Sequence, residues 1–299
     1  MILLHKRREY IYAIGAVFCW STAATAFKIA LELVDIYQLL FIATGFASLI
    51  LVALGLFKFG AVELLECFHR HWKLTLLAGL INPVVYYNLL FQAYDMLPAQ
   101  VALSINYSWS IVLTLMSGVV LRQKVYKVDY LVAGASYFAV VIIATQGDLK
   151  SLYGSNMIGV VIALLSTFAW AFYWILTIKD PRESLKGLCL NFIVALPLTG
   201  VTCYVFSDFE FSFEGFLAAS YVGTIEMALG FLLWSSALKL STSTSRISNL
   251  MFLSPFISLV FIRLILEENI KISTFFGLAV IIVGLLVQQR AHSRLVSKT

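Results

Sequence analysis

The sequence is poor in charged residues and in cysteine, and both shortages limit its class. Only 12% of the 299 residues are Asp, Glu, Lys or Arg, against ~25% in soluble globular domains. The four cysteines show no CxxC spacing, and Cys67 with His69 and His71 lacks a second ligand pair, so neither disulfides nor a metal site is expected. The chain also lacks a Gly-rich phosphate loop, HExxH and GxSxG, so we expect no cofactor, no ATP hydrolysis and no enzyme activity.

Apolar residues dominate instead, at 61% of the chain with a mean hydropathy of +0.92. A helix that crosses a bilayer needs ~20 mainly apolar residues, so ten spans would use about 200 residues and leave short connections. The sequence therefore predicts an all-α membrane protein with ten transmembrane helices. The expected spans are 10–31, 36–57, 73–94, 98–121, 128–146, 156–178, 187–206, 213–238, 245–266 and 271–289.

The positive charges predict the orientation of these spans. Seventeen of the 21 Lys and Arg residues fall in the termini and in every second connection, whereas the other connections collect Asp and Glu. Lys and Arg are retained on the cytoplasmic side, so we expect a protein of the cytoplasmic membrane with both termini in the cytoplasm. The net charge of +5 is a topology signal and gives no reason to expect nucleic acid as a partner.

An internal repeat divides the chain into two halves. The clearest match pairs Gly79-Leu80-Ile81-Asn82 with Gly223-Thr224-Ile225-Glu226, 144 residues apart. Further matches in the same order pair Trp20 with Trp170 and residues 107–109 with 253–255. Because each half holds five spans, the second half must enter the membrane upside down. We therefore expect two inverted five-helix repeats, 1–147 and 148–299, an architecture common in alternating-access transporters.

With this order and spacing, the chain resembles the EamA-like families of the drug/metabolite transporter superfamily. The residues that carry the resemblance are Trp20, Lys28, Trp170, the stretch 223–239, Leu253-Ser254-Pro255-Phe256, Leu266-Glu267-Glu268, Gly277 and Gly284. It implies ten spans in two five-helix halves and a carrier of metabolites, often an exporter. The chain departs from the pattern in span two, where 41–45 lacks the frequent Arg, and at the end of span four, where Trp109 and Arg122-Gln123 replace Pro and Glu.

Glu226 is the strongest candidate for a functional residue. An ionised, unpaired carboxylate in mid-membrane costs about 2.5–3.5 kcal/mol to insert, so its side chain should face a polar interior. There it would exchange a proton or bind a cationic group. The alternative is a protonated Glu that only ties helices together.

Asn82 and Lys28 are the other polar candidates inside spans. Asn82 is the repeat mate of Glu226, so it would face the same cavity, unless it only forms an interhelical hydrogen bond. Pro83 would open the helix beside it or merely kink it. Lys28 would extend its ammonium to the interface, or else turn inward to neutralise Glu226 or attract a substrate carboxylate.

Aromatic residues complete the expected site. Trp20, Tyr86, Tyr87, Trp170 and Trp174 fall in spans one, three and six, which the repeat places near a cavity; ordinary packing is the alternative. Small residues recur every seven positions at 223, 230 and 237 and predict close helix approach beside Glu226.

These residues favour a transporter that moves a small metabolite by alternating access through spans one, three, four, six, eight and nine, and the family resemblance implies an exporter. One acid and one base in a cavity would suit an amino-acid-like substrate, and protons are a candidate coupling ion. The expected partners are therefore the small-molecule substrate, membrane lipid and protons. A flippase for a lipid-linked or amphipathic molecule is the alternative, and a membrane-embedded receptor or enzyme is a remote one.

Overall fold

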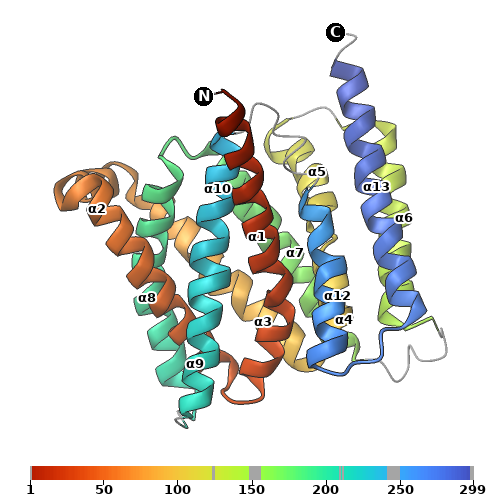
Figure 1. The fold of residues 1–299 in the computed structure, drawn as a ribbon, viewed down its shortest axis with the longest axis horizontal. Coiled ribbons are helices and arrows are strands. Elements are labelled where there is room, and N and C mark those ends of the chain that lie inside the picture. The colour runs from red at the N-terminus through yellow and green to blue at the C-terminus, as the bar shows by residue number, and fades with distance from the viewer. Residues whose placement is uncertain are drawn as a thin grey trace.

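The protein is helical throughout the part of the chain that the computed structural model describes, which is residues 2–122, 125–147, 156–208, 210, 212–240 and 250–296. The side chains of 2–7, 239 and 292–296 are outside this description. No strand occurs in these ranges. The helices run side by side, and both termini lie at the same end of the molecule (Figure 1).

The helices of the first half are α1 (Ile2–Leu31), α2 (Ile36–Gly79), η1 (Leu80–Val85), α3 (Tyr86–Met96), α4 (Ala99–Asn106), α5 (Trp109–Val120) and α6 (Lys127–Ala144). Those of the second half are α7 (Met157–Lys179), α8 (Ser184–Phe206), α9 (Phe213–Tyr221), η3 (Val222–Gly230), α10 (Phe231–Leu240), η4 (Met251–Leu253), α12 (Ser254–Ile265) and α13 (Ile272–Val296).

Eight helical stretches of the described chain are long and apolar enough to cross a membrane. One of them, Ile36–Met96, has 61 residues and contains both expected spans 36–57 and 73–94. The shorter apolar helix Met251–Ile265 lies where the ninth span is expected. The start of that span, at 245–249, and the boundary between 147 and 148 involve residues outside the description. The protein is thus a multi-pass membrane protein, and the count of ten stays a proposal.

The segment 58–72, which connects the expected spans 36–57 and 73–94 and contains Cys67, was expected to be a polar loop, but it is largely helical. The chain turns at Gly60, whose φ of 76° is open to glycine at little cost, and again at His71. The helical residues between them bury Leu64. Ion pairs from Lys58 to Glu183 and from Lys186 to Glu63 tie this segment to the start of α8.

Both expected repeat mates lie where α-helical geometry is interrupted. Asn82 has non-helical φ and ψ of −138° and 117° inside η1, next to Pro83, which lacks a backbone N–H donor. Glu226 lies in η3, and both η1 and η3 are π-helical. π-helical segments are rare and occur frequently at functional sites. The two interruptions fall at positions that the 144-residue offset pairs.

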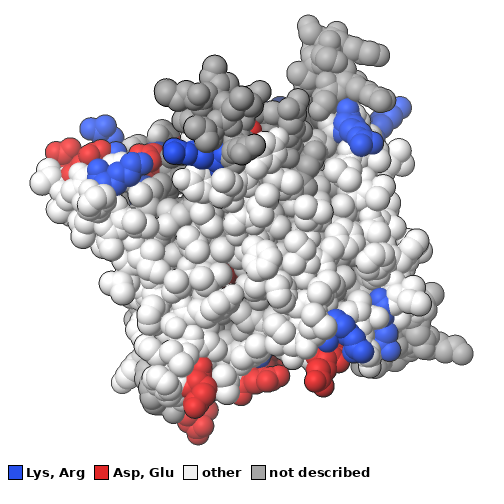
Figure 2. All heavy atoms as spheres, viewed as in Figure 1, with Lys and Arg blue, Asp and Glu red and all other residues white. Residues whose placement is uncertain are grey.

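The surface has the division expected of a protein surrounded by lipid. Charged side chains gather at two opposite ends, and the band between them is almost free of charge (Figure 2). Large apolar side chains are exposed, among them Phe57 at 93% and Leu264 at 72%. Soluble monomers rarely expose apolar patches of this extent.

Candidate functional site

A cavity of about 350 Å³ lies among the helices. Its walls come from α1, α3, α4, α5, α7, η3 and α10, with Met251 and Phe252 of η4. These elements belong to the six spans that the sequence predicts as cavity lining. We call this space the central cavity. Among the described residues that line it, Glu226 is the one charged side chain.

Glu226 is held in the wall by one direct polar contact. The Tyr87 hydroxyl donates to both carboxylate oxygens, Oε1 and Oε2, at 2.7 Å. Tyr87 is fully buried and Glu226 is 8% exposed. In the described part of the chain no cation lies within ion-pair distance of Glu226. Tyr87, which does not line the cavity, therefore orients the carboxylate from the side away from the cavity, while Glu226 itself lines the cavity.

Small residues bring the helix of Glu226 close to its neighbours, as the seven-residue spacing predicts. A Cβ atom added to Gly223 would lie 2.2 Å from the backbone oxygen of Ala43. A Cβ added to Gly230 would lie 2.7 Å from Nε1 of Trp20. These contacts leave no room for larger side chains, so they fix η3 against α2 and α1.

Aromatic rings form most of the rest of the wall. Tyr86 stacks on Trp170 with centroids 4.3 Å apart, and Trp170 meets Trp174 edge-on at 5.8 Å. Trp20 packs edge-on against Phe231 at 5.6 Å. Of the predicted aromatic residues, the structure places Trp20, Tyr86, Trp170 and Trp174 in the cavity wall, while Tyr87 stands behind it. The central cavity is therefore mainly apolar, with one carboxylate in its wall.

Asn82 and Lys28 lie away from this wall. Asn82 is fully buried near the Tyr173 hydroxyl, and neither polar atom of its amide has a hydrogen bond in the described structure. The Lys28 ammonium donates to the backbone oxygens of Tyr94 at 2.8 Å and Leu97 at 3.3 Å. Lys28 thus binds the last carbonyls of α3, where a cation is favourable. It is not paired with Glu226.

Several residues of the cavity wall were not predicted from the sequence, among them Trp234, Asn106 and Trp109. Trp234 follows Glu226 by eight residues, a helical spacing that could have placed both on one side. Asn106, a polar residue inside an apolar span, donates to Ser166 Oγ at 3.2 Å and lies beside the Tyr86 hydroxyl. Trp109 stacks on Trp174 at 6.1 Å, a contact between distant segments that local spacing does not reveal.

No group of three or more His, Cys, Asp or Glu side chains that could hold a metal occurs among the described residues. The fold and the cavity define a class: an all-helical, multi-pass membrane protein with an aromatic cavity that holds a carboxylate. Residues 7–145 and 157–288 both match the model of the EamA-like transporter family. The chain belongs to this family, which is part of the drug/metabolite transporter superfamily.

Two related proteins align with this chain over nearly their whole length, and both are named as transporters. The chain is 24% identical to "Uncharacterized transporter YvbV" of Bacillus subtilis, over 94% of this chain and 92% of that protein. It is 25% identical to an "Uncharacterized transporter" of Archaeoglobus fulgidus, over 93% and 97% respectively. A solved structure titled "Crystal structure of protein" shares the fold with a TM-score of 0.65 at 16% identity, covering 96% of this chain and 98% of the other.

Proposed function

We propose that this protein exports a small amphipathic or amino-acid-like metabolite across the cytoplasmic membrane by alternating access. Ten spans in two inverted five-helix repeats, 1–147 and 148–299, would carry the movement. The paired interruptions at η1 and η3 support this arrangement, because inverted-repeat carriers place broken helices at the midplane site.

The observation that carries the proposal is the composition of the central cavity. Stacked Tyr86 and Trp170 provide apolar surface, and Glu226 provides one charge at a fixed position. A pocket of this kind holds the apolar part of a ligand on its walls and orients it through few polar groups. An ammonium or another hydrogen-bond donor on the substrate would meet Glu226.

Glu226 would also couple movement to protons. Because no cation pairs with it in the described structure, its carboxylate can be neutralised either by a proton or by a bound cationic group. If the two compete, substrate binding on one side releases a proton, and proton binding on the other side releases the substrate. This exchange needs no ATP.

Reconstituted protein tests the proposal most directly. Uptake and efflux across a panel of cationic, anionic, zwitterionic and neutral metabolites should identify at least one transported compound. Glu226→Gln keeps the shape of the side chain but cannot release a proton, so it should abolish flux driven by a pH gradient while the protein stays folded. The exposed Glu66→Gln is the matched control and should transport normally. Unchanged proton-driven flux in Glu226→Gln would refute the coupling.

Reporter fusions test the ten-span topology separately. Fusions after Lys58, Arg122, Lys186 and Thr299 should report the cytoplasm, because these sites lie among the inner basic residues. Fusions near Asp35, Lys150 and Asp208 should report the opposite side. A cytoplasmic signal at Asp208 would contradict ten spans.

A further inference from the structure

Asn82 and Glu226 occupy matched positions in the two halves of the chain but have different surroundings. One family model matches residues 7–145 and again residues 157–288, which supports an internal repeat. The 144-residue offset pairs Asn82 with Glu226, and each lies in a π-helical segment, η1 or η3. Glu226 lines the central cavity, whereas Asn82 is 0% exposed. The structure is therefore asymmetric at this pair.

The enclosed amide of Asn82 lacks the contacts that a structural role would give it. Neither its Nδ2 nor its Oδ1 has a hydrogen-bond partner in the described structure. Most buried polar groups are hydrogen-bonded, because an unpaired one loses its hydration without compensation. Asn82 therefore does not tie helices together here, and an apolar side chain would pack at lower cost. The amide becomes useful if another conformation gives it a partner.

A second cavity, of about 310 Å³, is separated from Asn82 by one layer of side chains. We call it the junction cavity, because it lies beside the connection between α7 and α8. Ala78, four residues before Asn82, lines it, and so do Tyr173 and Asn191. The Tyr173 hydroxyl lies beside the side chains of Asn82 and Asn191. Tyr173 thus stands between the amide of Asn82 and the junction cavity.

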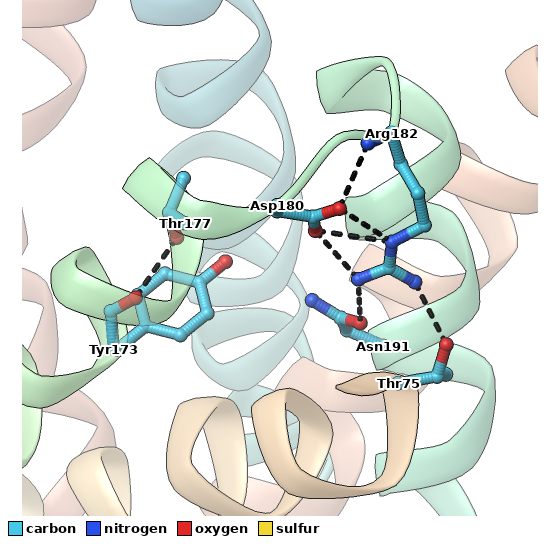
Figure 3. Close-up of polar contacts among 6 residues, drawn as sticks. All are labelled: Thr75, Tyr173, Thr177, Asp180, Arg182 and Asn191. Atoms are coloured by element: carbon cyan, nitrogen blue, oxygen red, sulfur yellow. Dashed lines mark hydrogen bonds and ion pairs between the residues drawn. The ribbon is translucent and has the colours of Figure 1, made fainter. Parts of the chain in front are cut away.

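A closed set of polar contacts around Arg182 holds this layer in place. Arg182 donates to the two Asp180 carboxylate oxygens at 2.8 Å from Nε and 2.7 Å from Nη2. Its Nη1 also donates to Thr75 Oγ1 at 2.7 Å, and its Nη2 donates to Asn191 Oδ1 at 3.2 Å. The ring of Tyr173 extends toward this cluster (Figure 3). Because the Arg182 side chain is 1% exposed, these contacts join α2, which leads into η1, to α8 and the α7–α8 connection.

Two inverted copies of one fold can exchange their conformations. When they do, the opening moves to the other side of the membrane, and each copy takes the surroundings that its mate had before. Applied to the matched pair, this exchange covers Glu226 and uncovers Asn82. It requires the Arg182 contacts to open and Tyr173 to move away from the amide.

We infer that Asn82 is a second substrate-contact residue, which the opposite conformation uncovers toward the junction cavity and which binds an uncharged hydrogen-bonding group such as a hydroxyl or an amide. The inference rests on the proposed alternating-access function and adds a contact to it. The Asn82 side chain offers two N–H donors and one carbonyl acceptor without charge, whereas Glu226 suits a cationic group. The two positions therefore select different groups of one substrate.

Thiol accessibility tests whether the two positions exchange exposure, and it needs no identified substrate. The four native cysteines are replaced by alanine, and Asn82→Cys and Glu226→Cys are made separately in that background. The probe is a cationic, membrane-impermeant methanethiosulfonate added to purified protein. Thr75→Val removes one acceptor of Arg182 and so disfavours the conformation in which Asn82 is covered. It should raise the reaction rate of Asn82→Cys at least tenfold and lower that of Glu226→Cys.

Thr177→Val is the matched control. The Thr177 hydroxyl lies at the same cavity but donates to the backbone oxygen of Tyr173 in its own helix at 2.9 Å, so its loss should change neither rate. An Asn82→Cys variant that stays unreactive with and without Thr75→Val would overturn the exchange. So would rates that rise together at both positions, since they would indicate general loosening.

Asn82→Leu separates a substrate contact from packing. Leucine has the same branching but no polar atom, so the melting temperature should stay equal or rise. Transport of a compound that the native protein carries should fall at least tenfold, and Asn82→Ser, which keeps a donor and an acceptor, should retain more transport. Native-like transport by Asn82→Leu would overturn the inference and leave the proposed role of Glu226 intact. If the native protein carries no compound of the panel, the proposed function fails instead, and the thiol rates still decide the exchange.

Discussion

Replacing Tyr87 with Phe removes the single hydroxyl that orients Glu226. This hydroxyl donates to Oε1 and Oε2 at 2.7 Å inside a site with no other direct polar contact to the carboxylate in the described structure. A hydrogen bond to a charged group contributes about 1.5–3 kcal/mol. Tyr87→Phe should therefore lower the free energy of unfolding by about that amount, because Glu226 stays buried and loses its donor.

The same loss should alter transport in a way that general destabilisation does not. A change of 1.36 kcal/mol in the free-energy difference between two protonation states moves a titration midpoint by one pH unit. Removing the Tyr87 hydrogen bond should therefore displace the midpoint of pH-dependent transport by about one to two pH units. The assay is the initial rate of proton-driven flux in proteoliposomes between pH 5 and 9, with unfolding followed in detergent.

Tyr94→Phe is the matched control, because Tyr94 is a buried tyrosine of the same helix that lines the central cavity, whereas the hydroxyl that donates to Glu226 in the described structure is that of Tyr87. It should change neither the unfolding free energy nor the pH midpoint by a comparable amount. A Tyr87→Phe profile that coincides with the native one would refute the view that Tyr87 tunes Glu226. So would an equal effect of Tyr94→Phe.

Two further substitutions test the packing and the role of Lys28. Gly223→Ala should lower the free energy of unfolding by about 1–3 kcal/mol, because its Cβ would overlap the backbone oxygen of Ala43. Gly134→Ala is the control and should be neutral or stabilising, because the space around Gly134 is open. Equal melting temperatures for the two variants would refute the close contact. Lys28→Met should lower stability by about 1–3 kcal/mol through loss of its bond to the Tyr94 carbonyl, and should leave substrate selectivity unchanged. Altered selectivity at native stability would instead place Lys28 in the substrate path.

The membrane class and the family resemblance could be predicted from the sequence because hydropathy and charge act locally. Glu226 stands out for the same reason: an acid amid apolar residues is costly wherever the helix packs. Its contact with Tyr87 could not be predicted, since 139 residues separate the two and only tertiary packing brings the hydroxyl to the carboxylate.

The contacts of two basic residues, Arg182 and Lys28, could not be predicted from the sequence. Arg182 counts in the sequence as one more inner cation, whereas the structure buries it against Asp180 and Thr75. Lys28 was expected either at the interface or beside Glu226, and the structure places it on the carbonyls that end α3. Thr75 lies on another helix and the partners of Lys28 are backbone carbonyls, and periodicity carries no information about contacts of these kinds.

An experimental structure with a transported compound bound tests the central claim most directly. The compound comes from the transport panel, and the structure is determined at a concentration that saturates transport. We expect ligand density in the central cavity, with its apolar part against Tyr86 and Trp170 and a donor group within hydrogen-bond distance of Glu226. Density for a saturating transported substrate elsewhere, with the central cavity unoccupied, would contradict the assignment.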